Sequence, residues 1–142
     1  MDQAKAILFY LVPAIFVIVG LVHFYWAVGG KKFVSSTIPE KNGKPLFQPT
    51  FTITAIMGLA FFAFAVGVLA FGGLVAVPLE PRVIRFCVLV MLALFFGRMI
   101  GDFQYIGLFK KVKGSRFSHN DDLYFIPFCG VLAVMLSVLL RQ

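Results

Sequence analysis

Charged residues are scarce in this chain. Asp, Glu, Lys and Arg together make up 13% of its 142 residues, against about 25% in an average soluble domain. Hydrophobic residues make up 61%, and 18 residues are phenylalanine. A soluble domain of this size could not keep so much apolar surface away from water. The composition therefore excludes an ordinary soluble protein.

Cysteine is also scarce, and the two present form no C-x-x-C pair, which argues against thiol-redox chemistry. Cys87 and Cys129 fall early in successive apolar runs, which as antiparallel helices would separate them by about 15 Å along the axis. A disulfide needs Cα atoms within about 7 Å, so we expect two unpaired packing residues. The sequence contains no phosphate loop, nucleophile elbow, haem-attachment motif or established metal-ligand spacing. It identifies no cofactor.

Four long apolar runs fill most of the chain, at residues 7–28, 51–71, 83–106 and 123–140. Each reaches or approaches the roughly 20 residues that a helix needs to cross a hydrocarbon layer. Backbone polar groups cannot stay unpaired in lipid, so such runs must be helical. We therefore predict an all-α fold, a four-helix transmembrane bundle with antiparallel up-down topology. Residues 1–142 form a single membrane domain, because no loop is long enough to fold alone.

Basic residues gather in the loops after the first and third runs, at 29–50 and 107–122. Eight then lie on one face of the membrane: Lys31, Lys32, Lys41, Lys44, Lys110, Lys111, Lys113 and Arg116. The opposite face has four: Lys5, Arg82, Arg85 and Arg141. The positive-inside rule places both basic loops in the cytoplasm and both termini outside. Because the net charge of +7 is concentrated beside the spans, it does not indicate nucleic-acid binding.

The first run is interpreted as a retained span and not as a cleaved signal peptide. It is about 22 residues long, whereas the apolar core of a signal peptide usually has about 7–15. It also ends in aromatic residues at 24–26, which suit a membrane interface.

The loop at 29–50 combines lysines, prolines and large apolar side chains. Phe33, Leu46 and Phe47 interleave with its lysines, a composition that fits contact with lipid headgroups, so membrane lipids are expected partners. A purely flexible linker would not need its three prolines. Two interpretations stay open: a lid over the inner ends of the helices, or a loop resting in the interface.

The third run carries Arg98, Asp102 and Tyr105 at positions i, i+4 and i+7, which lie on one face of a helix. A charge at depth costs roughly 2.5–3.5 kcal/mol on insertion scales. An Arg98–Asp102 ion pair is the obvious local solution. Arg before Asp is the poorer order at this spacing, which leaves room for a partner on another helix.

Further polar residues are expected at the inner ends of the first and fourth runs: His23, Tyr25, Trp26, Asp121 and Tyr124. Ionisable residues within a membrane indicate a functional site. Each also has a structural explanation, since His23 could hydrogen-bond within an aromatic interface and Arg98–Asp102 could be a packing ion pair. Asp121 or Asp122 could cap the fourth helix. His119, in a basic loop, is expected to be solvated.

Several sequence blocks occur together: His-Phe-Tyr-Trp-Ala-x-Gly-Gly at 23–30, Gly-x-Pro-Leu-Phe at 43–47, Arg-x-x-Gly-Asp-Phe at 98–103 and Gly-x-Phe-Lys-Lys-Val at 107–112. With these blocks the chain resembles a family of small bacterial four-span membrane proteins catalogued as a domain of unknown function. The resemblance covers nearly the whole chain. It implies the four-span fold and a bacterial inner membrane, and it implies no activity.

The favoured hypothesis is a multi-pass membrane protein that binds or converts an amphiphile, such as a lipid, a quinone or an isoprenoid. His23 is the candidate acid or base, and Asp102 would orient His23 or Arg98. The candidate ligand-binding residues are Arg98, Tyr105, Trp26, Tyr25, Asp121 and Tyr124. Whether the protein is an enzyme stays open.

Two alternatives also stay open. The first is an accessory or assembly subunit without a ligand. A homo-oligomeric or membrane-protein partner would dock on the small-residue face of Ala63 and Gly67. The second is a small proton-coupled transporter, although no acidic residue lies near the centre of any run.

Overall fold

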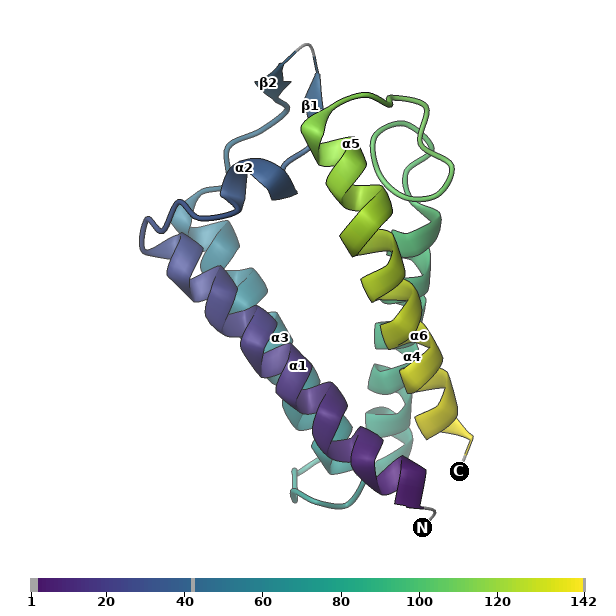
Figure 1. Ribbon diagram of the computed structural model, residues 1–142. Coiled ribbons are helices and arrows are strands. Elements are labelled where there is room, and N and C mark those ends of the chain that lie inside the picture. Colours follow the sequence, from purple (N-terminus) through teal and green to yellow (C-terminus); the bar gives the residue numbers. More distant parts are fainter. Residues whose placement is uncertain (1–2, 42, 142) are drawn as a thin grey trace.

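The computed structural model describes residues 3–41 and 43–141, and four long helices dominate it (Figure 1). They are α1 (Gln3–Ala27), α3 (Phe51–Phe71), α4 (Pro81–Ile100) and a last helix, Arg116–Leu140. The last helix comprises α5 (Arg116–Asn120), the π-helical turn η1 (Asp121–Phe125) and α6 (Ile126–Leu140). Between α1 and α3 lie the short α2 (Val34–Thr37) and an antiparallel pair, β1 (Glu40–Lys41) with β2 (Lys44–Pro45). The predicted all-α, four-helix fold is confirmed.

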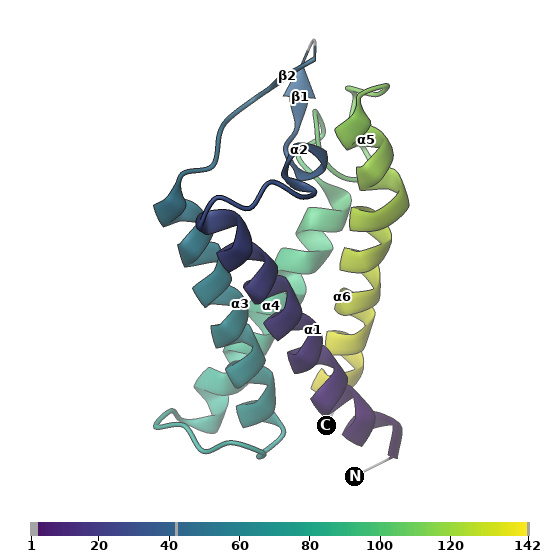
Figure 2. The ribbon, with the colours of Figure 1, turned by 60° about the vertical axis from the view of Figure 1, so that its left-hand side comes forward.

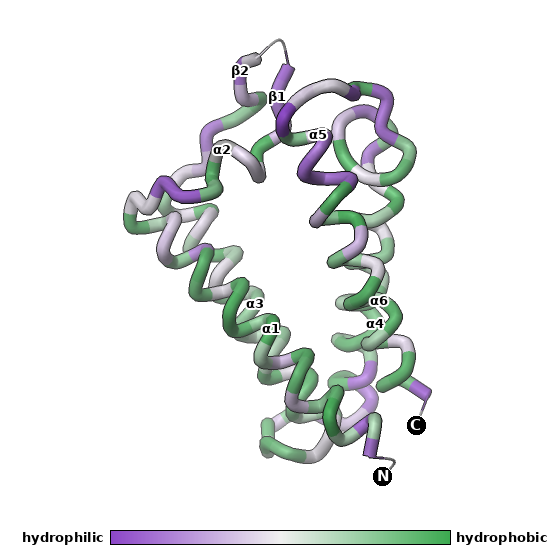
Figure 3. The backbone as a smooth tube through the Cα atoms, viewed as in Figure 1, coloured by the Kyte–Doolittle hydropathy of each residue, from purple (hydrophilic) through white to green (hydrophobic). Residues whose placement is uncertain are grey.

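All four long helices have the length and apolar composition to cross a membrane. Within the protein, only 17% to 39% of the most apolar window of each helix is buried. Large apolar side chains such as Ile18, Leu59, Phe86 and Val134 are exposed. Figure 3 shows hydrophobic residues along the helices, and hydrophilic ones at the end that carries α2 and the strands. Helices with this much outward apolar surface are stable in lipid and not in water, so the chain is an integral membrane protein.

The long helices form two pairs, because α1 packs along α3 and α4 packs along α6. The two pairs lie close together at the end that carries the chain termini and spread apart toward α2 (Figures 1 and 2). The buried core accordingly fills the close end, with Phe9, Val12 and Phe16 of α1 at its centre. It is completed by Ala65, Val68, Val88, Met91, Phe95, Cys129, Leu132, Ala133, Leu136, Leu139 and Leu140.

Two hydrogen bonds tie the close end together at the C-terminus of α6. The Arg85 guanidinium of α4 donates to the Leu140 carbonyl at 3.1 Å, and the Lys5 ammonium of α1 donates to the Arg141 carbonyl at 3.0 Å. The last carbonyls of a helix have no partner within the helix, so basic side chains from two neighbouring helices satisfy them here.

Small residues set the contact between α1 and α3. A Cβ on Gly58 would lie 2.9 Å from the Phe24 ring, and one on Gly20 would lie 3.1 Å from the Gly58 carbonyl oxygen. The glycines therefore allow a backbone approach that alanine would obstruct. Ala63 is exposed, whereas a Cβ on Gly67 would meet the Met91 side chain of α4 at 2.9 Å. A partner on the Ala63/Gly67 face remains a prediction.

Helix starts follow from capping residues. Thr50 caps α3, and its hydroxyl oxygen accepts the Ile53 N–H at 3.4 Å. Ser115 caps the last helix by accepting the Ser118 N–H at 3.0 Å. The expectation that Asp121 or Asp122 caps this helix is wrong. The helix begins before them, at Arg116, because Ser115 supplies the side-chain oxygen that a first turn needs.

Candidate functional site

Asp121 is the most enclosed charged residue, with no exposed surface. Its carboxylate accepts three hydrogen bonds: from Arg98 Nη2 at 2.7 Å, from the Gly107 N–H at 2.8 Å and from Lys110 Nζ at 3.1 Å. Buried carboxylates are stable only when their oxygens are satisfied in this way. The residue thereby joins α4, the loop at 101–115 and the start of η1.

Lys110 is the second buried ion, 3% exposed. Its ammonium donates to Asp121, to the Gly107 carbonyl and to the Asp122 carboxylate. Arg98, Lys110, Asp121 and Asp122, here named the Asp121 network, hold two positive and two negative charges. Within the described residues, Arg98 Nη1 is buried without a hydrogen-bond partner. A charge-balanced network of this kind fixes packing, since removing one member leaves the others uncompensated.

The predicted Arg98–Asp102 pair is wrong, because α4 ends at Ile100 and not near residue 106. Gly101 takes a positive φ of 94°, and its N–H still reaches the Gly97 carbonyl at 2.8 Å. Asp102 and Tyr105 therefore lie in a loop and do not share a helical face with Arg98. Arg98 instead pairs with Asp121 of the last helix. The sequence had left open such a partner on another helix, because Arg before Asp is the poorer order for a local pair.

Asp102 organises the loop at 101–115. Its Oδ1 atom accepts the N–H groups of Gln104 at 2.9 Å, Tyr105 at 2.7 Å and Ile106 at 2.9 Å. Slight burial raises the pKa of Asp102, but these backbone donors stabilise its charged form more strongly. The pKa of Asp102 consequently lies below its ordinary value of 3.8.

Two glycines permit the tight path of this loop. A Cβ on Gly101 would lie 1.8 Å from the Ile106 carbonyl oxygen, and one on Gly107 would lie 2.4 Å from the Gly101 Cα. Both also have positive φ, 94° and 85°, which glycine adopts without strain. The close crossing of these backbones brings the Gly107 N–H to Asp121.

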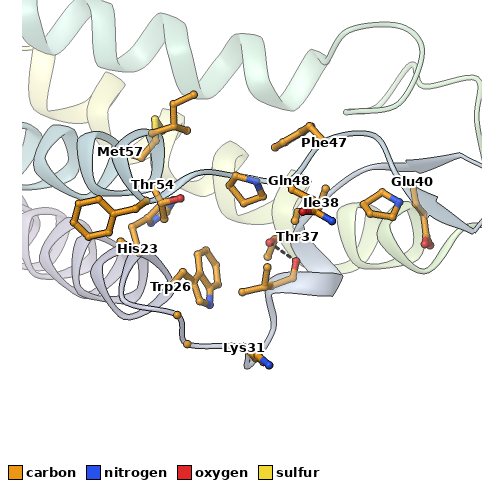
Figure 4. Close-up of a pocket in the computed structure, with 18 of the residues that line it drawn as sticks. His23, Trp26, Lys31, Thr37, Ile38, Glu40, Phe47, Gln48, Thr54 and Met57 are labelled. Atoms are coloured by element: carbon orange, nitrogen blue, oxygen red, sulfur yellow. Dashed lines mark hydrogen bonds between the residues drawn. The ribbon is translucent and has the colours of Figure 1, made fainter.

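A pocket of 970 Å³ lies at the spread end of the bundle, on the side of α1 and α3. The last turns of α1, the first turns of α3 and the loop at 28–50 line it, and we name it the loop pocket (Figure 4). Ile38, Phe47, Phe51, Ile53 and Met57 supply much of its apolar wall. The Asp121 network does not line it.

His23 and Trp26 line the loop pocket from α1. The imidazole Nδ1 lies 2.8 Å from the Val19 carbonyl oxygen, and the ring lies 5.2 Å from the rings of Trp26 and Phe61. Trp26 Nε1 donates to the Lys32 carbonyl at 2.8 Å. Trp26 thus connects the end of α1 to the loop above it, whereas His23 contacts residues of α1 and α3.

The loop at 28–50 also reaches across to the other helix pair. The Glu40 carboxylate accepts the Arg116 N–H at 2.8 Å, and the Asn120 amide donates to the Ser36 carbonyl at 3.5 Å. The loop is therefore folded over the spread end and held there by contacts with α5.

Comparison with protein families matches residues 16–136 to a family described as "Protein of unknown function (DUF3995)". The matched segment contains the blocks at 23–30, 98–103 and 107–112. It also contains the loop pocket and the Asp121 network. The chain belongs to the DUF3995 family. No curated protein and no solved structure matches it.

In this DUF3995 protein the expected site residues fall into separate groups. His23 and Trp26 line the loop pocket, and Arg98 and Asp121 belong to the Asp121 network. The others lie outside both: Asp102 and Tyr105 in the loop at 101–115, and the exposed Tyr25 and Tyr124. The chemical roles suggested for these residues remain predictions.

Other residues in the two sites of the DUF3995 protein could not be predicted from the sequence. The sequence predicts Lys110 only as one of the basic residues of the loop at 107–122, and its apolar neighbours Leu108 and Phe109 are themselves exposed and give no signal of its burial. Thr37 and Thr54 line the loop pocket, and threonine in or beside an apolar run carries no distinctive signal. Cys87 and Cys129 are free. Within the described residues, no three His, Cys, Asp or Glu side chains are grouped to hold a metal.

Proposed function

We propose that the protein binds an amphiphile in the loop pocket. The observation that carries the proposal is a 970 Å³ pocket at the end of two membrane helices, at the upper end of the roughly 300–1,000 Å³ typical of small-molecule sites. The ends of α1 and α3 that line the pocket lie where apolar helices give way to more hydrophilic loops (Figure 3). A ligand there can keep an apolar chain among the helices and a polar head beneath the loop.

The lining supports a ligand with two chemical halves. Phe51, Ile53 and Met57 of α3 make one wall of the pocket apolar. His23 and Thr54 add polar atoms beside that wall. Figure 4 shows His23, Thr54 and Trp26 toward one end of the pocket and Glu40 toward the other. Apolar walls with a few polar groups are typical of ligand sites. The proposal is one of binding, and it assigns no reaction to His23.

The proposal narrows the set of ligand-contacting residues. His23 and Trp26 remain in it because they line the loop pocket. Arg98 and Asp121 instead hold α4 to the last helix. The Asp102 carboxylate accepts hydrogen bonds from backbone groups of its own loop. We assign these three residues to the framework of the spread end.

We also propose a bacterial inner membrane as the location, with the spread end in the cytoplasm and both termini outside. The support is the distribution of basic residues. Eight lie in the two loops of the spread end and four near the close end, with Arg98 within a span. The positive-inside rule predicts this orientation from such a bias.

Native mass spectrometry of the protein released from detergent tests the proposal. The decisive variant is Met57→Trp, which fills the loop pocket from α3, compared with Arg98→Ala, which lies outside its lining. We expect a bound small molecule in the wild type and in Arg98→Ala, and none in folded Met57→Trp. If wild type is empty and co-purifies with one stoichiometric membrane protein, binding is refuted and the accessory-subunit alternative is favoured.

A further inference from the structure

The side chains that line the loop pocket offer more free hydrogen-bond acceptors than free donors. Four of its lining side chains, His23, Trp26, Thr37 and Thr54, carry a single N–H or O–H in their neutral form. In each case that hydrogen is already used on a backbone carbonyl. His23, Thr37 and Thr54 can therefore still offer a ligand only acceptors, and Trp26, whose indole has no acceptor, offers neither.

The two threonines show this directly. Thr54 Oγ1 donates to the Thr50 carbonyl at 2.8 Å. Thr37 Oγ1 donates to the Val34 carbonyl at 2.9 Å, the bond drawn in Figure 4. A hydroxyl has one hydrogen and two lone pairs. With the hydrogen occupied, both oxygens can only accept.

His23 is in the same condition. A carbonyl oxygen cannot donate, so the 2.8 Å contact with Val19 requires the hydrogen of a neutral imidazole to reside on Nδ1. Nε2 then carries a lone pair and is an acceptor. Trp26 Nε1–H is occupied by the Lys32 carbonyl and has nothing further to give.

Glu40 adds to the same polarity at the far end of the pocket. One carboxylate oxygen accepts the Arg116 N–H at 2.8 Å, and an ionised carboxylate has only acceptor sites to offer. Lys31 and Gln48 are the lining side chains with unused donors, and both are exposed to solvent. The enclosed part of the pocket is thus rich in acceptors, and its free side-chain donors lie at the rim.

From this we infer that the ligand of the loop pocket is an uncharged amphiphile whose head carries a hydroxyl group. The inference rests on the proposed function and narrows its ligand class. A hydroxyl donates to His23 Nε2 or Thr54 Oγ1, whereas a head with only carbonyl or ether oxygens faces other acceptors without a shared hydrogen. Desolvating such a head without a new hydrogen bond is unfavourable. Long-chain alcohols and hydroxylated lipids are favoured over quinones, and anionic heads are rejected.

Trp26 provides the measurement, because it lines the pocket and the chain contains one tryptophan. The probes are a dibrominated long-chain alcohol and its methyl ether with the same chain, since bromine quenches tryptophan fluorescence and the two differ by one donor hydrogen. Titrations use the full chain in nanodiscs, with each probe expressed as its mole fraction in the bilayer. We expect saturable quenching by the alcohol at a mole fraction about tenfold lower than by the ether.

The variants make the comparison specific. His23→Phe keeps a ring and removes Nε2, and Thr54→Val keeps the shape and removes the oxygen. In either variant the alcohol-to-ether ratio should fall toward one. Because the ratio compares two probes on one sample, a partly unfolded preparation does not alter it. Leu59→Met changes an exposed side chain of α3 outside the lining and should keep the wild-type ratio.

The remaining outcomes separate the two claims. Equal binding of alcohol and ether, or tighter binding of the matching carboxylate, overturns the hydroxyl inference and leaves the proposed function standing. Tighter binding of the matching ammonium overturns it in favour of a cationic head facing Glu40. Absence of saturable quenching by any of the probes overturns the proposed function and the inference with it.

Discussion

Arg98 and Asp121 are joined across two helices at 2.7 Å, although Asp102 stands four positions after Arg98 in the sequence. The pairing is decided by burial. Asp121 has no exposed surface, whereas Asp102 is exposed and its Oδ1 already accepts three backbone hydrogen bonds. The ion that most needs a counter-charge is the one that obtains it.

The first prediction concerns the Asp121 network. Asp121→Ala leaves Lys110 buried without one of its two counter-charges, so we expect a loss of stability of about 3–5 kcal/mol. Arg98→Ala should be milder, about 1.5–3 kcal/mol, because Lys110 and the Gly107 N–H still satisfy Asp121. Thermal unfolding in detergent, monitored by circular dichroism, measures which of the two variants has the lower melting temperature.

Asp122→Ala is the matched control for Asp121→Ala. It removes a neighbouring carboxylate that also bonds Lys110, but its side chain is 58% exposed. We expect a much smaller drop in melting temperature. Equal drops for the two aspartate variants would show that enclosure of Asp121 is not what makes it important.

The second prediction concerns the three hydrogen bonds to Asp102. Asp102→Ala should lower the hydrogen-exchange protection of residues 104–106, while Asp102→Asn, which keeps an acceptor oxygen, should retain much of it. Protection is expressed relative to the intrinsic exchange rate of each amide. Unchanged protection in Asp102→Ala would contradict a role for this carboxylate in the loop.

The same hydrogen bonds predict a dependence on pH. The folded pKa of Asp102 lies below 3.8, so its charged form is favoured by folding. The stability it contributes is fully present above pH 3.8 and is lost as the pH falls through the lowered value. Protection of residues 104–106 in wild type should fall in that acid range, and Asp102→Asn should show no such step.

The third prediction compares glycines. Gly101→Ala and Gly107→Ala should disrupt the loop severely, because each new methyl would overlap backbone at 1.8 Å or 2.4 Å. Gly114→Ala meets no atom within 4 Å but has a φ of 88°, so strain of about 1–2 kcal/mol is expected. Gly97→Ala, in open space within α4, should be neutral or stabilising. Melting temperatures that fail to follow this order would refute the close crossing.

The fourth prediction tests the proposed orientation. In a chain whose Cys87 and Cys129 are replaced by alanine, single cysteines at Lys113 and Leu79 report on the two faces. Both positions are exposed. An impermeant thiol reagent added to intact cells should label Leu79→Cys and leave Lys113→Cys unlabelled until the cells are opened. The reverse pattern would invert the topology.

Much of the fold could be predicted because lipid leaves the backbone few choices. Runs such as 51–71 had to be helices, and α3 has those bounds. The end of α4 was misplaced because the sequence stays apolar beyond it. Gly101 and Asp102, both turn-forming residues, were the available signal that the helix stops.

The site was harder to predict because helical spacing describes only contacts within one helix. The spacing of Arg98 and Asp102 indicated a local pair, while the true partner of Arg98 lies 23 positions away. Lys110 was predicted only as one of the basic residues of a cytoplasmic loop, and its charge did not indicate that it is buried. The loop pocket depends on how residues 28–41 and 43–50 lie over the ends of α1 and α3, which no periodic pattern encodes.

The core and the loop pocket occupy opposite ends of the same helices and share no residue. Phe9, Val68 and Leu136 hold the helices together, while His23, Thr54 and Met57 stand where the pairs have separated. Substitutions in the pocket therefore change none of the side chains of the buried core. Mutations that alter the shape or polarity of the pocket are tolerated in such a molecule, since the core at the other end supplies the stability that folding requires. The architecture allows the side chains at one end of this protein to change while its helices remain assembled at the other.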